Sequence, residues 1–232
     1  MGSMRIAVVS DVHGNLTALE AVLADLDRVK PDVVVYAGDM ALGGPHPVEV
    51  VDRVRELGWP AVLGNSDAVL AADPVLRDKV RGFVAEATMR TAAMLGRERV
   101  DWLTRLPIEW RQEDVVVVHA VPGDCWAVVE HDATDQALID TFGVLGVPIA
   151  VYGHIHRPYL RRIDELTVVN SGSVSLSADG DPRASYVVLD SGRVEHHRVA
   201  YDVERVAADL LRIDYPNATG YADWLRTGNL ER

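Results

Sequence analysis

The chain has 232 residues, of which 48% are hydrophobic and 25% are charged, a composition typical of globular proteins. Its formal net charge of -12 argues against a large basic face for nucleic acids, although not against a small anionic substrate. No apolar run approaches the length of a membrane span, and the single cysteine, Cys125, excludes an intramolecular disulfide framework and predicts a cytoplasmic location.

The first part of the chain alternates between strand and helix patterns. The opening "MGSM" is typical of an expression-tag remnant at residues 1–3, so we expect one domain over residues 4–232. Apolar runs predict three strands, and apolar residues at helical spacing predict two helices between them. The strands are expected at 4–10, 32–37 and 60–64, and the helices at 15–30 and 47–57. This βαβαβ order favours a parallel sheet with covering helices.

The later part of the chain changes character. A helical pattern runs from Pro74 to about Leu95, and five short strands bounded by Gly, Pro and Asp-Gly turns follow it. These strands are expected at 114–120, 148–154, 166–172, 184–192 and 193–200. From about residue 202 the chain returns to helix, where we expect Tyr215, Tyr221 and Trp224 to cover an intramolecular groove rather than a partner surface. Two packed sheets with outer helices are the simplest architecture.

Five predicted strands end in side chains that can bind a metal ion. They are Asp11 and His13 in "SDVHGN", Asp39 in "AGD", Asn65 in "LGNSD", His119 in "VVVVHA", and His154 and His156 in "YGHIH". Because ligands bind at the carboxyl ends of strands in open α/β sheets, we expect these side chains to converge. Each could instead be a helix cap, a turn residue or a core histidine. Five such coincidences at five strand ends favour one common site.

The ordered motifs D-x-H, G-D, G-N-x-[DE], a lone H and G-H-x-H resemble those of the calcineurin-like metallophosphoesterase superfamily, in its small bacterial and archaeal phosphodiesterases. The phrase "NSGSVS" at 170–175 is similar to the segment that follows the last histidines in those proteins. The resemblance implies an α/β fold, specifically a four-layer α-β-β-α sandwich of two mixed β-sheets with outer helices. It also implies a dinuclear metal centre.

The resemblance further implies seven ligands in two groups and a bridge: Asp11, His13 and His156 for one metal, Asn65, His119 and His154 for the other, and Asp39 between them. Carboxylate, imidazole and amide ligands without a thiolate favour Mn, Fe or Zn, with Mg and Ni as further candidates. A water between the metals would ionise near neutral pH and attack phosphorus as hydroxide. Asp39, Asn65 and His119 would therefore be catalytic through that hydroxide.

One residue departs from the pattern of many relatives. Ser66 follows the metal-binding asparagine at the position where they have a histidine thought to protonate the leaving group. Because a serine hydroxyl is a poor acid, Ser66 is expected to contact substrate only, and esters with stable anionic leaving groups are favoured. His46, after Asp39, is the preferred substitute acid, against the alternative of a solvated loop residue. Asn15 is expected either to contact phosphate or to cap a helix.

These observations predict a metal-dependent phosphoesterase that hydrolyses phosphodiester or phosphomonoester bonds of a small substrate, for which a nucleotide is one candidate. The alternative is a dinucleoside-polyphosphate hydrolase, which matches an anionic leaving group. A non-catalytic scaffold of the same fold is a third hypothesis, and the presence of all seven ligands argues against it. The expected partner is a small phosphorylated substrate, with no membrane and no stable nucleic-acid binding.

Overall fold

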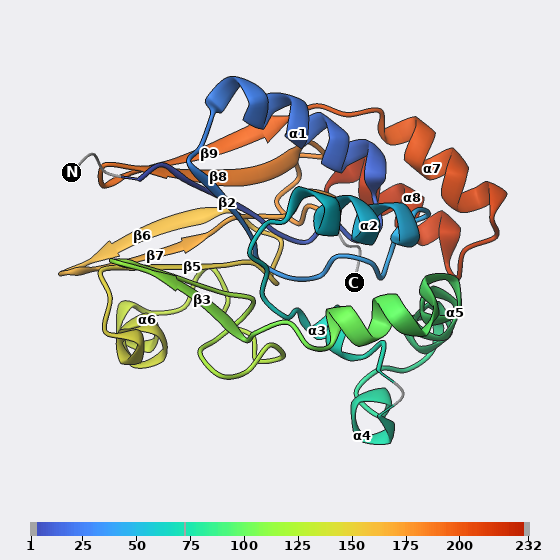
Figure 1. Ribbon diagram of the computed structural model, residues 1–232, viewed down its shortest axis with the longest axis horizontal. Coiled ribbons are helices and arrows are strands. Elements are labelled where there is room, and N and C mark those ends of the chain that lie inside the picture. The colour runs from blue at the N-terminus through green and yellow to red at the C-terminus, as the bar shows by residue number, and fades with distance from the viewer. Residues whose placement is uncertain (1–3, 72, 230–232) are drawn as a thin grey trace.

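The computed structural model describes residues 4–71 and 73–229, so the tag remnant expected at residues 1–3 lies outside the described residues. Two β-sheets pack face to face and carry helices on their outer sides (Figure 1). The first sheet has the order β2-β1-β8-β9, formed by β1 (Ile6–Val9), β2 (Val33–Tyr36), β8 (Ala184–Asp190) and β9 (Arg193–Val199). The second has the order β3-β4-β5-β7-β6, formed by β3 (Glu109–Gln112), β4 (Val115–Val118), β5 (Ile149–Tyr152), β6 (Tyr159–Ile163) and β7 (Leu166–Asn170). Both sheets combine parallel and antiparallel pairs, as predicted.

The central strands are apolar throughout because both of their faces are covered. In β1, Ile6 and Val8 pack between the sheets, whereas Ala7 and Val9 contact the outer helices. The residues of β4 divide in the same way between the space between the sheets and the helix on the far side. Strands buried on both faces read as continuous hydrophobic runs rather than as an alternation.

Helices form the two outer layers, which confirms the four-layer sandwich. The helices α1 (Leu16–Val29) and α2 (Pro47–Leu57) cover the first sheet, and α6 (Asp135–Phe142) with the 3-10 turn η1 (Gly143–Leu145) covers the second. The remaining helices are α3 (Asn65–Ala68), α4 (Pro74–Arg77), α5 (Phe83–Leu103), α7 (Val203–Arg212) and α8 (Ala218–Thr227). Within residues 4–71 and 73–229, no helix has the length and apolarity needed to cross a bilayer.

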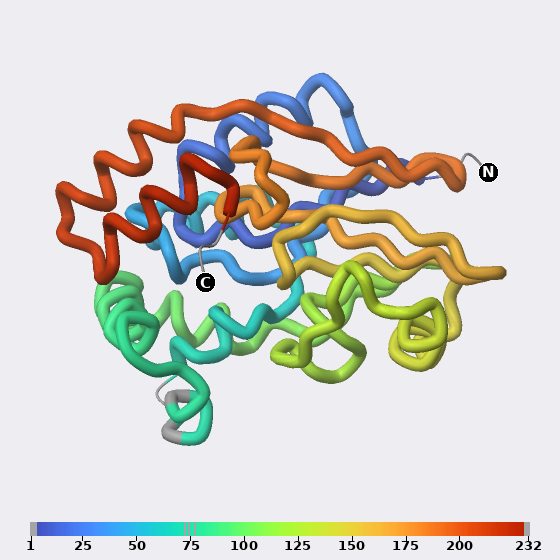
Figure 2. The backbone as a smooth tube through the Cα atoms, turned by 180° about the vertical axis from the view of Figure 1, so that it is seen from behind, coloured from blue at the N-terminus to red at the C-terminus, as the bar shows by residue number. Residues whose placement is uncertain are grey.

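The α7–α8 hairpin, the two antiparallel C-terminal helices, lies at the end of the sandwich opposite the N-terminus (Figure 2). Its apolar residues form a separate cluster with Leu42, Val69, Ala87 and Leu176. The Tyr215 hydroxyl accepts a hydrogen bond from Gly43 N at 3.0 Å, and Gly180 N donates to the Gly228 carbonyl at 3.0 Å. The hairpin is therefore attached both to the loop that follows β2 and to the loop that precedes β8.

Two sequence predictions about the elements were wrong, and several short elements were missed. The segment 60–64 is not a strand, because only Ala61 bridges to Tyr36 before the chain turns into α3. The single helix expected from Pro74 is divided into α4 and α5, since Gly82 has a φ of 57°, outside the right-handed helical range. The elements β3, β6, α3, α6 and η1 were not predicted.

Candidate metal centre

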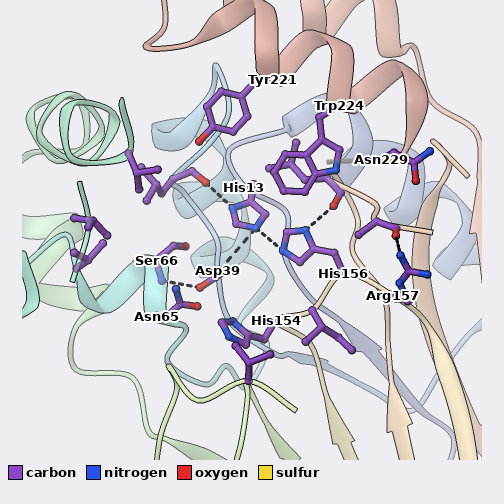
Figure 3. A pocket seen from close by; sticks show the side chains of 18 of the residues that line it. His13, Asp39, Asn65, Ser66, His154, His156, Arg157, Tyr221, Trp224 and Asn229 are labelled. Atoms are coloured by element: carbon purple, nitrogen blue, oxygen red, sulfur yellow. Dashed lines mark hydrogen bonds and ion pairs between the residues drawn. The ribbon is translucent and has the colours of Figure 1, made fainter. Parts of the chain in front are cut away.

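All seven predicted ligands gather on one edge of the sandwich, six of them at the carboxyl ends of strands and Asn65 at the start of α3. Five of them line a cavity of about 440 Å³: His13, Asp39, Asn65, His154 and His156 (Figure 3). The other two, Asp11 and His119, are buried behind these residues. The expected convergence of the strand ends is therefore present in the structure.

The backbone at these residues is unusual. Positive φ angles, between 49° and 66°, occur at five of the seven: Asp11, His13, Asp39, His154 and His156. Residues other than glycine seldom adopt this left-handed backbone conformation, and each instance typically costs on the order of 1–3 kcal/mol of folding free energy. Such strain concentrates at functional sites, where the surrounding structure holds it in place.

The first group of donor atoms comes from the loops after β1 and β5. Asp11 Oδ1 lies 3.2 Å from His156 Nε2 and 3.8 Å from His13 Nε2. The two Nε2 atoms are 3.1 Å apart. Together the three residues offer ligand atoms within 4.8 Å of one another, which is the geometry of a metal site.

Backbone carbonyls set the orientation of the imidazole rings. His13 Nδ1 donates to Leu42 O at 2.6 Å, His156 Nδ1 to Leu176 O at 2.5 Å, and His119 Nδ1 to Ala37 O at 2.8 Å. When an imidazole is neutral with its proton on Nδ1, its Nε2 carries a lone pair that can bind a metal ion, as in most metal-binding histidines. The facing Nε2 atoms of His13 and His156 are then two acceptors, for which a cation is the natural partner.

The second group contains Asp39, His119 and Asn65. Asp39 Oδ1 lies 3.4 Å from His119 Nε2, and Asp39 Oδ2 lies 3.8 Å from His13 Nε2. Asn65 Oδ1 is 2.9 Å from His119 Nε2, and the His154 ring centroid is 5.0 Å from that of His119. The Asp39 carboxylate therefore faces one member of each predicted group. The carboxylate and imidazole donors that lie within 4.8 Å here are those of Asp39, His119 and Asp11, rather than His154.

The donor set fits the divalent ions that the sequence implies. Asp11 Oδ1 is fully buried and accepts no hydrogen bond, an arrangement that is costly without a cation. Burial, assisted by the neighbouring His119, lowers the pKa of His154 to about 4. Burial, with His156 next, likewise lowers the pKa of His13. Both imidazoles are therefore neutral near pH 7, the form that binds metal.

Two glycines let the ligands approach one another. A Cβ on Gly64 would lie 2.0 Å from Asp39 Oδ1, and a Cβ on Gly153 would lie 2.5 Å from Asp11 Oδ2. Only glycine fits at these two positions without displacing a carboxylate. These two glycines therefore make room for ligands that come from neighbouring segments of the chain.

Asp67 supports the proposed site from behind the ligands, a role that the sequence analysis did not assign. Its two oxygens accept from Asp39 N at 2.8 Å and Met40 N at 2.9 Å. Burial and the Asp39 carboxylate raise the pKa of Asp67 to about 7. Asp67 thus holds the loop that carries Asp39. In the sequence, Asp67 is visible as the aspartate of "GNSD", two residues after the ligand Asn65.

The three predicted residues outside the ligand set differ in position. Asn15 is fully buried and caps α1, where its Oδ1 accepts from Ala18 N at 3.0 Å and its Nδ2 donates to Ser175 Oγ at 3.1 Å. These contacts match the capping alternative and leave the phosphate contact unsupported.

The Ser66 hydroxyl is buried without a hydrogen-bond partner, and Ser66 lines the cavity, as expected of a residue that contacts substrate. His46 stands at the start of α2, and its Nε2 lies 3.4 Å from Asp209 Oδ2 on α7. It is not among the lining residues that the structure describes. Its predicted role as acid therefore has no support from this geometry.

Comparisons with known proteins identify the family of this chain. A calcineurin-like phosphoesterase superfamily domain matches residues 4–193. The crystal structure of a metallophosphoesterase from Sphaerobacter thermophilus has a TM-score of 0.81 and 31% identity, covering 97% of this chain and 99% of that one. An uncharacterized protein of Methanocaldococcus jannaschii is 28% identical over 95% of this chain and 97% of its own.

Two relatives with named activities are also similar. The phosphodiesterase YfcE of Escherichia coli is 26% identical over 81% of this chain and 88% of its own. A symmetrical bis(5'-nucleosyl)-tetraphosphatase of Pectobacterium carotovorum is 33% identical, but the match spans only 52% of this chain and 43% of the relative.

The family match covers most of the chain and contains all seven residues of the site. The chain therefore belongs to the calcineurin-like phosphoesterase superfamily. It is a metallophosphoesterase, a hydrolase that acts on phosphoester bonds with the aid of divalent metal ions. The scaffold hypothesis is not supported.

Proposed function

We propose that this metallophosphoesterase hydrolyses a phosphodiester or phosphomonoester bond of a small substrate at two divalent metal ions. In this proposal Asp11, His13 and His156 hold one ion, Asn65, His119 and His154 hold the other, and Asp39 bridges them. The observation that carries it is the position of the Asp39 carboxylate, with one oxygen facing His13 and the other facing His119. Mn, Fe and Zn suit these ligands best, and Mg and Ni are further candidates.

The chain's own residues would bind the metal ions, orient the imidazole ligands and contact the phosphoryl group. Bound divalent ions would lower the pKa of water and take up charge on the phosphoryl oxygens. The carbonyls of Leu42, Ala37 and Leu176 would keep three imidazoles in the ligating tautomer. The unpartnered Ser66 hydroxyl would donate to a phosphoryl oxygen without supplying the leaving-group proton.

We also propose a cellular location, a substrate class and a domain organisation for the enzyme. A free, buried cysteine at position 125 supports a cytoplasmic location, and the acidic net charge supports a substrate that is not a nucleic acid. Residues 4–232 are proposed to form one domain, and no membrane partner is proposed.

A hydrolysis screen tests the activity. The protein, stripped with a chelator and reloaded with Mn²⁺, is assayed against aryl phosphodiesters, aryl phosphomonoesters, nucleotides, dinucleotides and sugar phosphates. An Asp39→Asn protein purified in parallel controls for contaminating phosphatases. Metal-dependent turnover of at least one class is expected in the wild type alone. Equal turnover in both proteins would contradict the proposal.

A second candidate, a dinucleoside-polyphosphate hydrolase, is favoured by the likeness to the Pectobacterium tetraphosphatase. The same screen separates the two candidates. Release of nucleotides from a dinucleoside tetraphosphate faster than release of phenolate from an aryl diester would favour the second.

A further inference from the structure

The cavity has two unlike sides. One side carries the proposed metal ligands, and the other is an apolar wall. We use this term for Leu42, Val69, Val80, Val84, Tyr221 and Trp224. Chemistry at phosphorus requires only the polar side, so the apolar wall calls for a separate explanation.

The aromatic part of the apolar wall is fixed in place beside the metal ligands. The Trp224 ring stacks on the His156 ring with centroids 5.7 Å apart and an interplanar angle of 23°. Its Nε1 donates to Ser177 O at 2.5 Å, which holds the indole in one orientation. Tyr221 lies one turn earlier on α8 and also faces the cavity (Figure 3). A group attached to phosphorus would therefore meet a preformed aromatic surface within a few bonds.

This surface comes from outside the family match. The matched domain ends at residue 193, whereas Tyr221 and Trp224 belong to α8. The α7–α8 hairpin is attached through Tyr215 and Gly228, as described above. A rigid addition that adds apolar side chains to the catalytic cavity is expected to act on substrate choice rather than on the reaction.

The charges around the cavity also favour an uncharged group over a second phosphate. Arg157 is the sole Lys or Arg among the lining residues that the structure describes, and its guanidinium donates to Ala178 O. Glu130 also lines the cavity, and its carboxylate would repel a second phosphate. A polyphosphate chain would find few cations here beyond the metal ions, whereas an uncharged ring would find the apolar wall.

We propose that Trp224 and Tyr221 determine substrate specificity by binding a flat aromatic group of the ester, such as a nucleobase or an aryl ring. Apolar area buried against the wall and ring-to-ring packing would supply the preference. This inference rests on the proposed function, because it assumes that the substrate phosphoryl group binds at the polar side.

Two non-hydrolysable ligands of equal charge test the inference without any leaving group. Phenylphosphonate and methylphosphonate are titrated calorimetrically into the Mn²⁺-loaded full chain. The wild type should bind the phenyl compound about tenfold more tightly, as burial of a ring predicts. Trp224→Ala should reduce that ratio to about two, and Trp224→Phe should retain most of it. Arg226→Ala is the matched control, since Arg226 is on the same helix but pairs with Glu204. Its ratio should equal that of the wild type.

A wild-type ratio near one, or a ratio unchanged by Trp224→Ala, would overturn the inference. Equal weakening of both ligands in Trp224→Ala, together with loss of Mn²⁺, would also overturn it, because Trp224 would then only support His156. If neither phosphonate bound the Mn²⁺-loaded wild type, the proposed function itself would fail, and the inference with it.

Discussion

The strand ends at the polar side of the cavity and the α7–α8 hairpin at its apolar wall are stabilised in different ways. At the strand ends, five proposed ligands have left-handed backbone, and buried carboxylates and imidazoles lie within 4 Å of one another. Both features cost folding free energy. In the hairpin, burial of apolar side chains stabilises the fold. The buried set there includes Val206, Leu210, Tyr215, Tyr221 and Leu225.

Because of this difference, substitutions in the two regions should have different effects. Substitutions at the strand ends should change metal binding and turnover, because the strained backbone is useful only if it positions ligands. Substitutions in the hairpin should change substrate preference or stability while the metals stay bound. The four variants below test the first half of this separation, at the polar side of the cavity, in order of decreasing expected effect.

The largest effect is expected from Asp39→Asn. Because this carboxylate faces both groups of donors, its loss should weaken both ions and nearly abolish hydrolysis. The loss should exceed the roughly 10–100-fold effect typical of residues that only support a ligand. Metal content and turnover of the soluble variant measure it. Asp209→Asn, at a carboxylate that pairs with His46 outside the cavity, is the matched control. Activity within a few-fold of wild type in Asp39→Asn would remove Asp39 from the site.

His156→Ala should affect mainly one ion. Its Nε2 belongs to the group with Asp11 and His13, so the metal content should fall by about one ion per chain, with a substantial loss of turnover. His197→Ala removes a histidine that stacks on Tyr186 far along the chain from the ligand motifs, and it should leave the metal content unchanged. Loss of both ions, or of neither, in His156→Ala would show that the proposed grouping is wrong.

Gly64→Ala tests the close approach of neighbouring loops. The added Cβ would lie 2.0 Å from Asp39 Oδ1, so the carboxylate or the loop must move. We expect a loss of about 1–3 kcal/mol in stability, typical of overpacking, together with weaker metal binding. Gly143→Ala is the control, because its Cβ would meet nothing closer than Ile139 Cγ2 at 3.8 Å. Thermal unfolding and metal content that matched wild type in both variants would contradict this explanation of Gly64.

Ser66→His should have the smallest effect and the most selective one. If no acid protonates the leaving group, the wild type should hydrolyse aryl esters much faster than alkyl esters, since general acids typically contribute about 10²–10⁴-fold where they are needed. The variant should raise alkyl turnover several-fold and aryl turnover less, because Asp67 is engaged by backbone and cannot orient the new imidazole. Equal wild-type rates on both ester classes, with chemistry rate-limiting, would indicate another acid. His46→Ala would then be the next variant.

Much of this site could be predicted from the sequence because the proposed ligands follow short apolar segments closely, at fixed spacings within each motif. Local pattern is sufficient there, since parallel strand ends meet at one edge. Tyr215, Tyr221 and Trp224 were expected to cover a groove within the chain; Tyr221 and Trp224 line the cavity, but a position beside the metal ligands was not predicted. The alternatives for Asn15 stayed open because an asparagine at a helix start serves as a cap or as a phosphate contact with the same sequence signature.

Other features depend on contacts that local pattern does not contain. Asp67 binds backbone amides that are 27 and 28 positions earlier, so its role appears only in the folded chain. The segment 60–64 has strand composition, but it forms a single isolated bridge, from Ala61 to Tyr36, before the chain turns into α3. The charged sequence of β6 hides a strand because its side chains are only partly covered.

The central claim is that the strained strand ends exist to hold two metal ions, and the metal content of the wild-type chain tests it most directly. The protein is stripped with a chelator, loaded with Mn²⁺, freed of excess metal and analysed by elemental mass spectrometry. About two ions per chain are expected, with both lost in Asp39→Asn and about one lost in His156→Ala. Fewer than one ion per wild-type chain, with no metal-dependent hydrolysis, would contradict it.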